Sequence, residues 1–201
     1  MLKNKIVLPK HFNVSSIKSV LDDFEFVFKL NGKQAPIFHF ELLKVEKPSM
    51  FGVLLLYKML EYTVINNCFS KASITYTHNV IFFQFIVKYG FHDLLSAFIS
   101  DKDNKIEKAF NNLKVFKGDK FIIAPKALLR EDKASREEIN KTYLPQIQSY
   151  YKSNTKAASM IMVVFSEILL NFWEHAKLDS QSIIVANGNN DQIEIACADT
   201  G

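Results

Sequence analysis

The C-terminal part of the chain has the clearest pattern of apolar and polar positions. From Ala157 onwards, apolar residues recur at steps of three and four, which is the spacing of one helix face. The residues of this face are Ile161, Val164, Phe165, Ile168, Leu169, Phe172 and Ala176. Asn154 or Thr155 is suited to cap the first turn. The pattern therefore predicts one long helix with an apolar face that packs on a core.

Two short strands are expected after this helix. Residues 182–186 and 192–198 have β-type composition, and the sequence Asn-Gly-Asn-Asn-Asp between them is a strong turn signal. In the second strand Ile193, Ile195 and Cys197 alternate with other residues, so one face of it is apolar. We expect a β-hairpin that leads directly into Asp199-Thr200-Gly201.

The first half of the chain alternates strand and helix patterns. Strands are predicted at residues 5–8, 35–42 and 72–77. Ser15 or Ser16 is expected to cap one helix, a second helix opens with Pro48 and Ser49, and two more span residues 79–89 and 91–95. The expected core face of the first helix is Ile17, Val20, Leu21, Phe24 and Phe28, and that of the second is Val53, Leu56, Tyr57, Leu60 and Val64. This order predicts an α/β domain with an at least partly parallel sheet.

A change in composition separates this half from the next. Residues 101–120 are rich in Lys, Asp and Asn and include a Gly-Asp pair, so we expect two domains, residues 1–115 and 116–201. A strand is predicted at residues 121–124. Ser135 and the two glutamates that follow have the pattern of a capping box that starts a helix, and Pro145 either ends or kinks this helix.

The composition is that of a globular protein. Of 201 residues 48% are hydrophobic and 23% are charged, and a net charge of +4 without a basic cluster does not favour a nucleic-acid partner. Cys68 and Cys197 suit a reducing compartment. No signal peptide is visible, and Glu167, Gln84 and Lys88 interrupt the two longest apolar runs. We therefore expect a cytoplasmic protein without nucleic-acid or membrane partners.

Polar residues suited to a site follow one another along the long helix. Glu167 stands inside the apolar run, Asn171 comes one turn later, and Glu174 and His175 close the helix. Steps of four and three place Glu167, Asn171 and either Glu174 or His175 on one stripe. Because a carboxylate among apolar side chains is costly unless it is paired or solvated, we expect a cleft with a bound ion or water.

The order of these parts resembles the Bergerat-fold ATPases, also called GHKL or histidine-kinase-like ATPases. This class includes gyrase, the heat-shock chaperone, histidine kinases, MutL and the anti-sigma-factor serine kinases. Their asparagine box lies on a helix and matches the Glu-x-x-x-Asn of residues 167–171, which is followed by Glu-His-Ala at residues 174–176. Their Asp-x-Gly motif lies at the end of a strand and matches residues 199–201. The resemblance covers about the last quarter of the chain and implies an α/β-sandwich domain.

The resemblance implies a role for each matching residue. Asn171 falls where the family holds the Mg²⁺ that bridges the nucleotide phosphates, and Glu167 falls where ATP-hydrolysing members hold a general base. Asp199 falls where the family accepts the adenine amino group, and Gly201 falls where the backbone passes the base. Glu174 and His175 occupy positions near the phosphates. The implied chemistry is ATP hydrolysis or phosphoryl transfer to a hydroxyl or a histidine.

One departure from the family limits this expectation. The family continues beyond the Asp-x-Gly motif into a lid, a second glycine motif and further strands, and the sequence stops at Gly201. We expect weak or undetectable ATP binding by these residues alone, and no catalysis.

The first half is similar to the STAS domain of anti-sigma-factor antagonists and sulfate transporters. The residues that carry this similarity are 35–56 and 89–95. In antagonists the matching turn carries Asp-Ser-Ser-Gly, whose second serine is phosphorylated by a Bergerat-fold kinase. Aligning Gly52 places Ser49 at that serine, although Lys47, Pro48 and Met50 depart from the motif. The similarity implies a protein partner in a regulatory switch, with Ser49 as a candidate phosphorylation site.

Simpler interpretations stay open for the same residues. Glu-x-x-x-Asn occurs on many solvated helix faces, a helix-end His175 is stabilised by the helix dipole, Asp199-Thr200-Gly201 alone is a turn, and Ser49 alone is a helix cap. The competing function is a non-catalytic interaction module. Such a module would act through its STAS-like domain and an open sheet edge that pairs with a partner strand, including that of a second copy in a homodimer.

Overall fold

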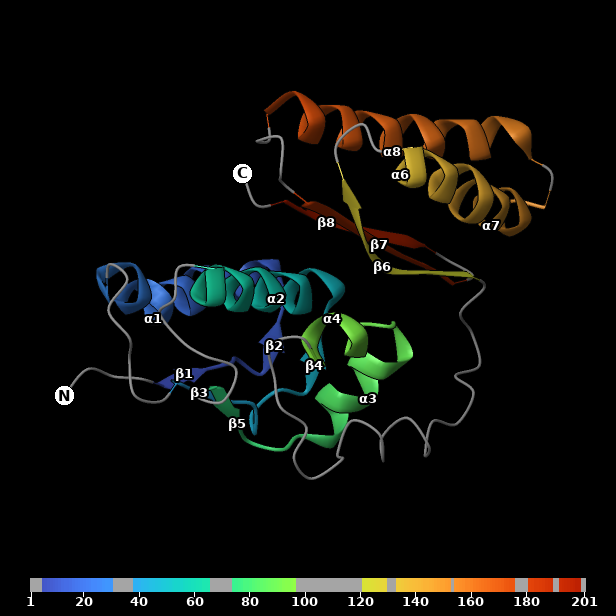
Figure 1. Ribbon diagram of the computed structural model, residues 1–201. Helices are drawn as coiled ribbons and strands as arrows, with labels where there is room; N and C mark the ends of the chain where they lie inside the picture. Colours follow the sequence, from blue (N-terminus) through green and yellow to red (C-terminus); the bar gives the residue numbers. More distant parts are fainter. Residues whose placement is uncertain are drawn as a thin grey trace. The chain divides into compact units, whose positions relative to one another are not determined.

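The chain consists of two compact units, Met1–Val115 and Phe116–Gly201. The computed structural model describes residues 5–30, 38–65, 74–96, 121–129, 133–152, 154–175, 181–189 and 192–199. Helices and both parallel and antiparallel sheets are present, so the α/β class is confirmed (Figure 1). The predicted boundary segment 101–120 and Cys68 lie outside the described residues.

The first unit contains a parallel sheet, as the alternation of strands and helices predicted. Its strands are β1 (Lys5–Val7), β3 (Phe38–Glu41) and β5 (Ile74–Tyr76), in the order β1-β3-β5. Strands β2 (His11–Phe12) and β4 (Lys47–Pro48) form a second, two-stranded parallel pair. All pairs in these two sheets are parallel, and a connection that contains a helix returns the chain between the two strands of each pair.

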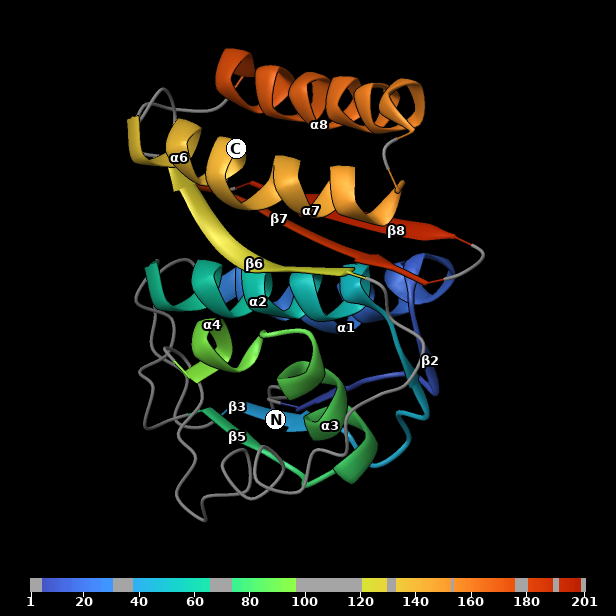
Figure 2. The same ribbon diagram turned by 90° about the vertical axis from the view of Figure 1, so that its right-hand side faces the viewer.

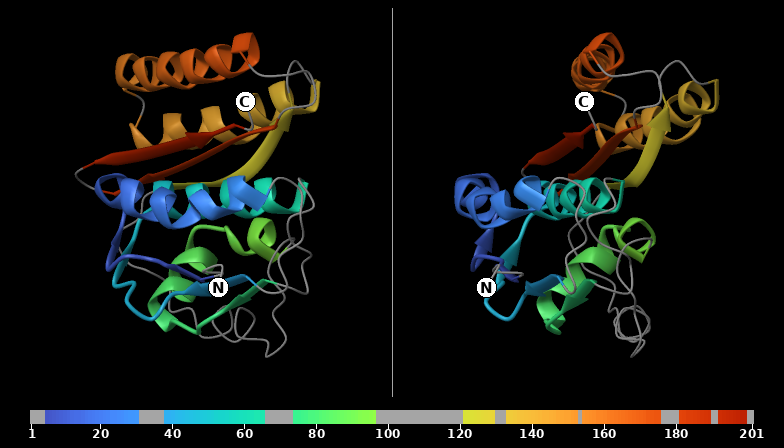
Figure 3. Two further views of the ribbon diagram at one scale, coloured as in Figure 1. Left: turned by 90° about the vertical axis from the view of Figure 1, so that its left-hand side faces the viewer. Right: turned by 60° about the vertical axis from the view of Figure 1, so that its left-hand side comes forward.

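Most of the buried apolar residues in the described part of this unit lie in helices. They are α1 (Ile17–Leu30), preceded by the 3-10 turn η1 (Val14–Ser16), α2 (Met50–Ile65), α3 (Val80–Lys88) and α4 (His92–Ser96). Helices α1 and α2 lie side by side on one side of the sheet (Figures 1 and 3). Four of the five predicted core residues of α2 are buried, namely Val53, Leu56, Tyr57 and Leu60.

Two predictions for α1 are wrong. The Asn13 side chain, not Ser15 or Ser16, caps the first turn, since its Oδ1 accepts a hydrogen bond from Ser15 N at 3.1 Å. The buried face also lies further round the helix than expected. Val27 is buried, whereas the predicted core residues Leu21 and Phe28 are exposed.

The second unit has an antiparallel sheet with helices on one side. Strands β6 (Phe121–Leu129), β7 (Gln181–Gly188) and β8 (Ile193–Ala198) pair in the order β6-β7-β8. The predicted hairpin between β7 and β8 is confirmed. Helices α6 (Lys133–Glu138), α7 (Leu144–Tyr150) and α8 (Thr155–His175) lie on the same side of this sheet (Figure 2).

The helix that contains Pro145 starts earlier than predicted, and Pro145 does not end it. It starts at Lys133, so Ser135 is a buried residue inside α6 and not its cap. The helix also continues through Pro145, because a π-helical turn, η3 (Ile139–Tyr143), precedes it. Leu144 N bonds Ile139 O in this wider turn, which accommodates a proline ring that lacks an N–H.

Helix α8 packs one face on the sheet, as predicted. Ala158, Phe165, Leu169 and Phe172 are buried. Val164, which was expected in this face, is exposed, and Ala176 lies outside the described residues. Among the described helices, α8 alone has the length and apolar composition of a membrane span, against the expectation that no span is present. Because one of its faces is part of a core, α8 is not clearly a membrane span.

Candidate functional site

The start of α8 is fixed by Asn154. Its Oδ1 accepts a hydrogen bond from Ala157 N at 3.1 Å, and its carbonyl oxygen accepts one from Ala158 N at 3.0 Å. These contacts satisfy backbone N–H groups that have no partner inside the helix, which is the role of an N-cap. Asn154 is therefore the cap, and the predicted helix start is confirmed.

The predicted site residues of α8 lie on its exposed side. Glu167, Asn171, Glu174 and His175 are all exposed. At about 100° per residue, Asn171 lies about 40° and Glu174 about 20° from Glu167 around the helix, whereas His175 lies about 80° away. Glu167 and Glu174 thus form one line and Asn171 lies beside it.

The Glu167 side chain is exposed and is not enclosed in a cleft. The expectation of an enclosed carboxylate is wrong because Glu167 points away from the buried face formed by Phe165 and Leu169. Among the described residues, no hydrogen bond or ion pair involves the side chain of Glu167 or of Asn171. The described part of the chain also has no group of three His, Cys, Asp or Glu side chains that could hold a metal ion. A metal at Asn171 would therefore need ligands from elsewhere, such as phosphate oxygens and water.

The hairpin register determines where Asp199 lies. Ile183 pairs with Ala198, so β8 ends beside the start of β7. Helix α8 ends at His175, and β7 begins at Gln181. A connection this short spans at most about 20 Å, so the end of β8 lies at the same end of the unit as the last turn of α8 (Figure 1). Asp199 is exposed there, and Gly201 lies outside the described residues.

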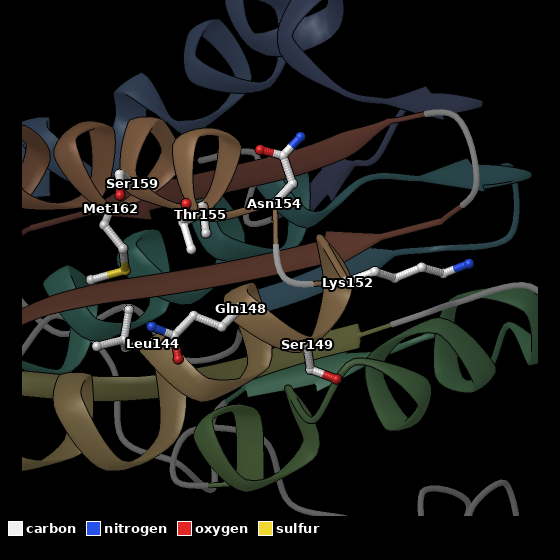
Figure 4. A pocket seen from close by; sticks show the side chains of 9 residues that line it. Leu144, Gln148, Ser149, Lys152, Asn154, Thr155, Ser159 and Met162 are labelled. Carbon is white, nitrogen blue, oxygen red and sulfur yellow. The ribbon is translucent and has the colours of Figure 1, made fainter.

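A pocket in the second unit lies elsewhere. A pocket of about 860 Å³ separates the end of α7 from the first turns of α8. It is lined by Leu144, Gln148, Ser149, Lys152, Asn154, Thr155, Ala158, Ser159 and Met162. Leu144 and Met162 point toward one another across it, while the Lys152 side chain extends away (Figure 4). None of the predicted site residues lines this pocket.

Sequence reasoning did not single out this pocket. The pattern that could have indicated it is a pair of small polar residues on each of two consecutive helices, joined by a short turn. Lys152 in that turn has a positive φ of 47°, which is uncommon for a residue other than glycine. The turn brings the polar end of α7 against the polar start of α8.

The buried side chains beneath the helices include polar groups. The Tyr143 hydroxyl, in the π-helical turn, has no hydrogen-bond partner among the described residues, and burial raises its pKa above the usual range. Lys126 on β6 donates a hydrogen bond to Glu138, which lowers the pKa of that carboxyl. Cys197 Sγ lies 3.3 Å from Ser182 Oγ across the hairpin. The Lys126–Glu138 pair joins α6 to β6, and none of these residues lines the pocket.

Ser49 is the N-cap of α2 in the first unit. Its Oγ accepts a hydrogen bond from Gly52 N at 3.0 Å and donates one to Phe12 O at 2.9 Å. Phe12 O also accepts a bond from Ser49 N at 3.0 Å. The half-buried hydroxyl therefore connects the start of a 16-residue helix to β2. A phosphate here would keep oxygen acceptors at the positive end of the helix dipole.

In comparisons with known proteins, no family model, no curated protein and no solved structure matches this chain. The resemblances to Bergerat-fold ATPases and STAS domains therefore rest on the motif residues.

Proposed function

We propose that the chain is a cytoplasmic ATP-binding regulatory protein of the histidine-kinase and anti-sigma-factor serine kinase type. In this proposal residues 116–201 are the first part of a Bergerat-type domain, and residues 1–115 are a STAS-like module. Asn171 holds Mg²⁺, Glu167 is the general base of a complete domain, and Asp199 accepts the adenine amino group. Glu174 and His175 lie toward the phosphates, and Gly201 lies beside the base.

The position of Asp199 relative to α8 is the observation that carries this proposal. The end of β8 lies at the same end of the second unit as the last turn of α8. A nucleotide with its base at Asp199 would therefore have its phosphates within reach of the exposed side of that turn. The exposure of Glu167 and Asn171 supports the proposal, since residues that act on a bound nucleotide must be accessible to it.

The role of Asn171 is compatible with the lack of a group of acidic, His or Cys ligands for the ion within the described ranges. Mg²⁺ commonly keeps several waters and takes one or two protein ligands together with substrate phosphates. One exposed amide oxygen is then enough on the protein side. The same reasoning predicts that metal binding depends on nucleotide, and that the metal alone binds poorly.

The parallel sheet and the capped start of α2 support the STAS-like assignment of the first unit. Ser49 follows a strand and opens a helix, as the phosphorylated serine does in the antagonists that this segment resembles. The protein partner in the proposed switch would recognise the surface around Ser49 differently before and after phosphate is added.

A nuclear magnetic resonance titration with Mg·ATP tests the proposal at millimolar nucleotide. The expected result is a set of shift changes in the last two turns of α8 and at the end of β8. Asn171→Ala should remove the part of the response that depends on Mg²⁺, and Asp199→Asn should remove the preference for ATP over GTP. Shift changes confined to other elements would contradict the proposal. Micromolar affinity for Mg·ATP in calorimetry would contradict the expectation of weak binding.

The competing function, an interaction module that acts through a sheet edge, has its own structural support. Within the described residues β8 pairs with β7 and forms an edge of the sheet. An edge strand offers backbone groups to a strand from a partner. Amide hydrogen exchange should then slow along β8 as protein concentration rises. A strict monomer by light scattering, with β8 exchange independent of concentration, would exclude this function for a homodimer.

A further inference from the structure

The side of α8 that faces away from the sheet is unusually apolar. Met160, Val163 and Leu170 have exposed fractions of 64%, 59% and 46%. At about 100° per residue they lie roughly opposite the buried Phe165. Lys156 and Glu174, both exposed, lie on the same line near the two ends of the helix. This outer face is the line of Lys156, Met160, Val163, Glu167, Leu170 and Glu174.

The spacing along the outer face is that of a coiled-coil seam. Successive members are separated by four, three, four, three and four residues. This alternation corresponds to the a and d positions of a heptad, and it places all six side chains within about 80° of one another. The face that packs on the sheet needs no such regularity. Three of the six side chains, those of Met160, Val163 and Leu170, are apolar, and the regular spacing of the line indicates a second helix as its partner.

The charges at the two ends indicate the direction of that helix. Lys156 lies nine residues before Phe165, and Glu174 lies nine residues after it. If an identical helix runs antiparallel along the outer face, with the centre of the pair at the level of Phe165, Lys156 lies opposite Glu174 at both ends. A parallel arrangement would place like charges opposite each other. Charge complementarity favours the antiparallel pair.

The same antiparallel register also brings apolar residues of the two helices opposite each other. Met160 and Leu170 lie five residues before and after Phe165, so each faces the other across the pair. Val163 and Glu167 lie two residues before and after it, so each valine faces a carboxylate. The two Met-Leu layers and the two terminal ion pairs favour association, whereas the central carboxylates oppose it.

We propose that a second copy of this chain docks on the outer face of α8, with the two helices antiparallel and centred on Phe165. The interface is modest because Glu167 occupies a seam position. The pairing would also cover Glu167 and Asn171, so a chain in this dimer could not bind nucleotide at the proposed site at the same time. The dimer itself does not depend on nucleotide, and it can be tested without any.

Sedimentation equilibrium of the whole chain, without nucleotide, tests the proposal. Lys156→Glu and Glu174→Lys should each weaken the dimer at least about tenfold, since each change creates two like-charge contacts in the symmetric pair. The double variant should recover most of the affinity of the original chain. Glu167→Leu should tighten the dimer at least about tenfold because it removes the central carboxylates. Lys18→Glu, an exposed charge reversal on α1, is the matched control and should change nothing.

All of these positions are exposed, so the substitutions should not unfold the chain. Circular dichroism of each variant checks this. A chain that is monomeric up to about millimolar concentration, in both its original form and as Glu167→Leu, would overturn the proposal. A dimer that ignores the Lys156 and Glu174 reversals would also overturn it, because the contact would then lie elsewhere. Failure of the double variant to recover affinity would refute the antiparallel register.

Discussion

Replacing Ser49 by alanine should destabilise the first unit by a predictable amount. The substitution leaves the Gly52 N–H, which is buried, without the acceptor that now lies 3.0 Å away. Loss of an N-cap costs about 1 kcal/mol, and a buried donor left without a partner costs about 1–3 kcal/mol. Phe12 O keeps its bond from the Ser49 N–H, so it contributes little. We expect the free energy of unfolding to fall by about 1–3 kcal/mol.

Ser49→Asp should be milder than Ser49→Ala. An aspartate keeps an oxygen acceptor for the Gly52 N–H and adds negative charge at the start of α2, which the helix dipole favours. Only the bond donated to Phe12 O at 2.9 Å is lost. We expect Ser49→Asp to retain at least half of the stability that Ser49→Ala loses. This stability of Ser49→Asp would mean that the fold tolerates a phosphate group on Ser49.

Urea denaturation followed by circular dichroism, together with amide exchange of α2, measures these effects. The single tryptophan, Trp173, lies in the second unit, so its fluorescence reports that unit separately. Ser19→Ala is the matched control, because Ser19 is an exposed serine whose Oγ donates only to Ser16 O. Its effect should stay within about 0.5 kcal/mol. A loss below about 0.5 kcal/mol for Ser49→Ala, or equal losses for Ser49→Ala and Ser49→Asp, would refute the capping argument.

Three further outcomes follow from the contacts. Gly52→Ala should cost about 1–3 kcal/mol in urea unfolding, because a Cβ there would lie 2.4 Å from Phe12 O; an unchanged midpoint would contradict this. Tyr143→Phe should raise the free energy of unfolding by about 1 kcal/mol, since it removes a buried hydroxyl without a partner among the described residues; a clear loss would reveal a missing partner. Hydrogen bonds from Lys5 and Thr77 lower the pKa of Glu41 to about 2, with the larger effect from Lys5. The stabilisation by the Glu41 carboxylate is therefore present above pH 4.5 and is lost as the pH falls toward 2, and acid titration of Lys5→Ala should lack the part of it that Lys5 provides.

The sequence predicted well the elements whose pattern leaves few alternatives. Most sides of helix α2 are apolar and buried, so its predicted core residues depend little on the exact rotation of the helix, and the turn residues determine the β7–β8 hairpin. The errors occur where an apolar residue lies at the boundary between the buried and the exposed side of a helix. Phe28 was expected in the core, but it is exposed and its ring lies 5.1 Å from that of Tyr62. On α8, Val164 belongs to the same apolar run as Phe165, and periodicity alone could not separate them.

The site was predicted only in part, for a related reason. Local spacing placed Glu167 and Asn171 on one side of a helix, and the turn residues placed Asp199 after a hairpin. Spacing does not determine which side of α8 faces the sheet, so an enclosed carboxylate was expected where the structure has an exposed one. The pocket between α7 and α8 depends on the angle of a turn, which the positive φ of Lys152 helps to set. No pattern in the flanking residues encodes that angle directly.

The most direct test of the nucleotide proposal replaces Mg²⁺ by Mn²⁺, which broadens the resonances of nearby amides. Titration of the chain with Mn²⁺ and ATP should broaden the last two turns of α8 around Asn171, and Asn171→Ala should remove this broadening. Mn²⁺ without ATP should have little effect. Broadening centred on Gln148 and Thr155, which line the pocket of about 860 Å³, or broadening unchanged in Asn171→Ala, would contradict the proposal.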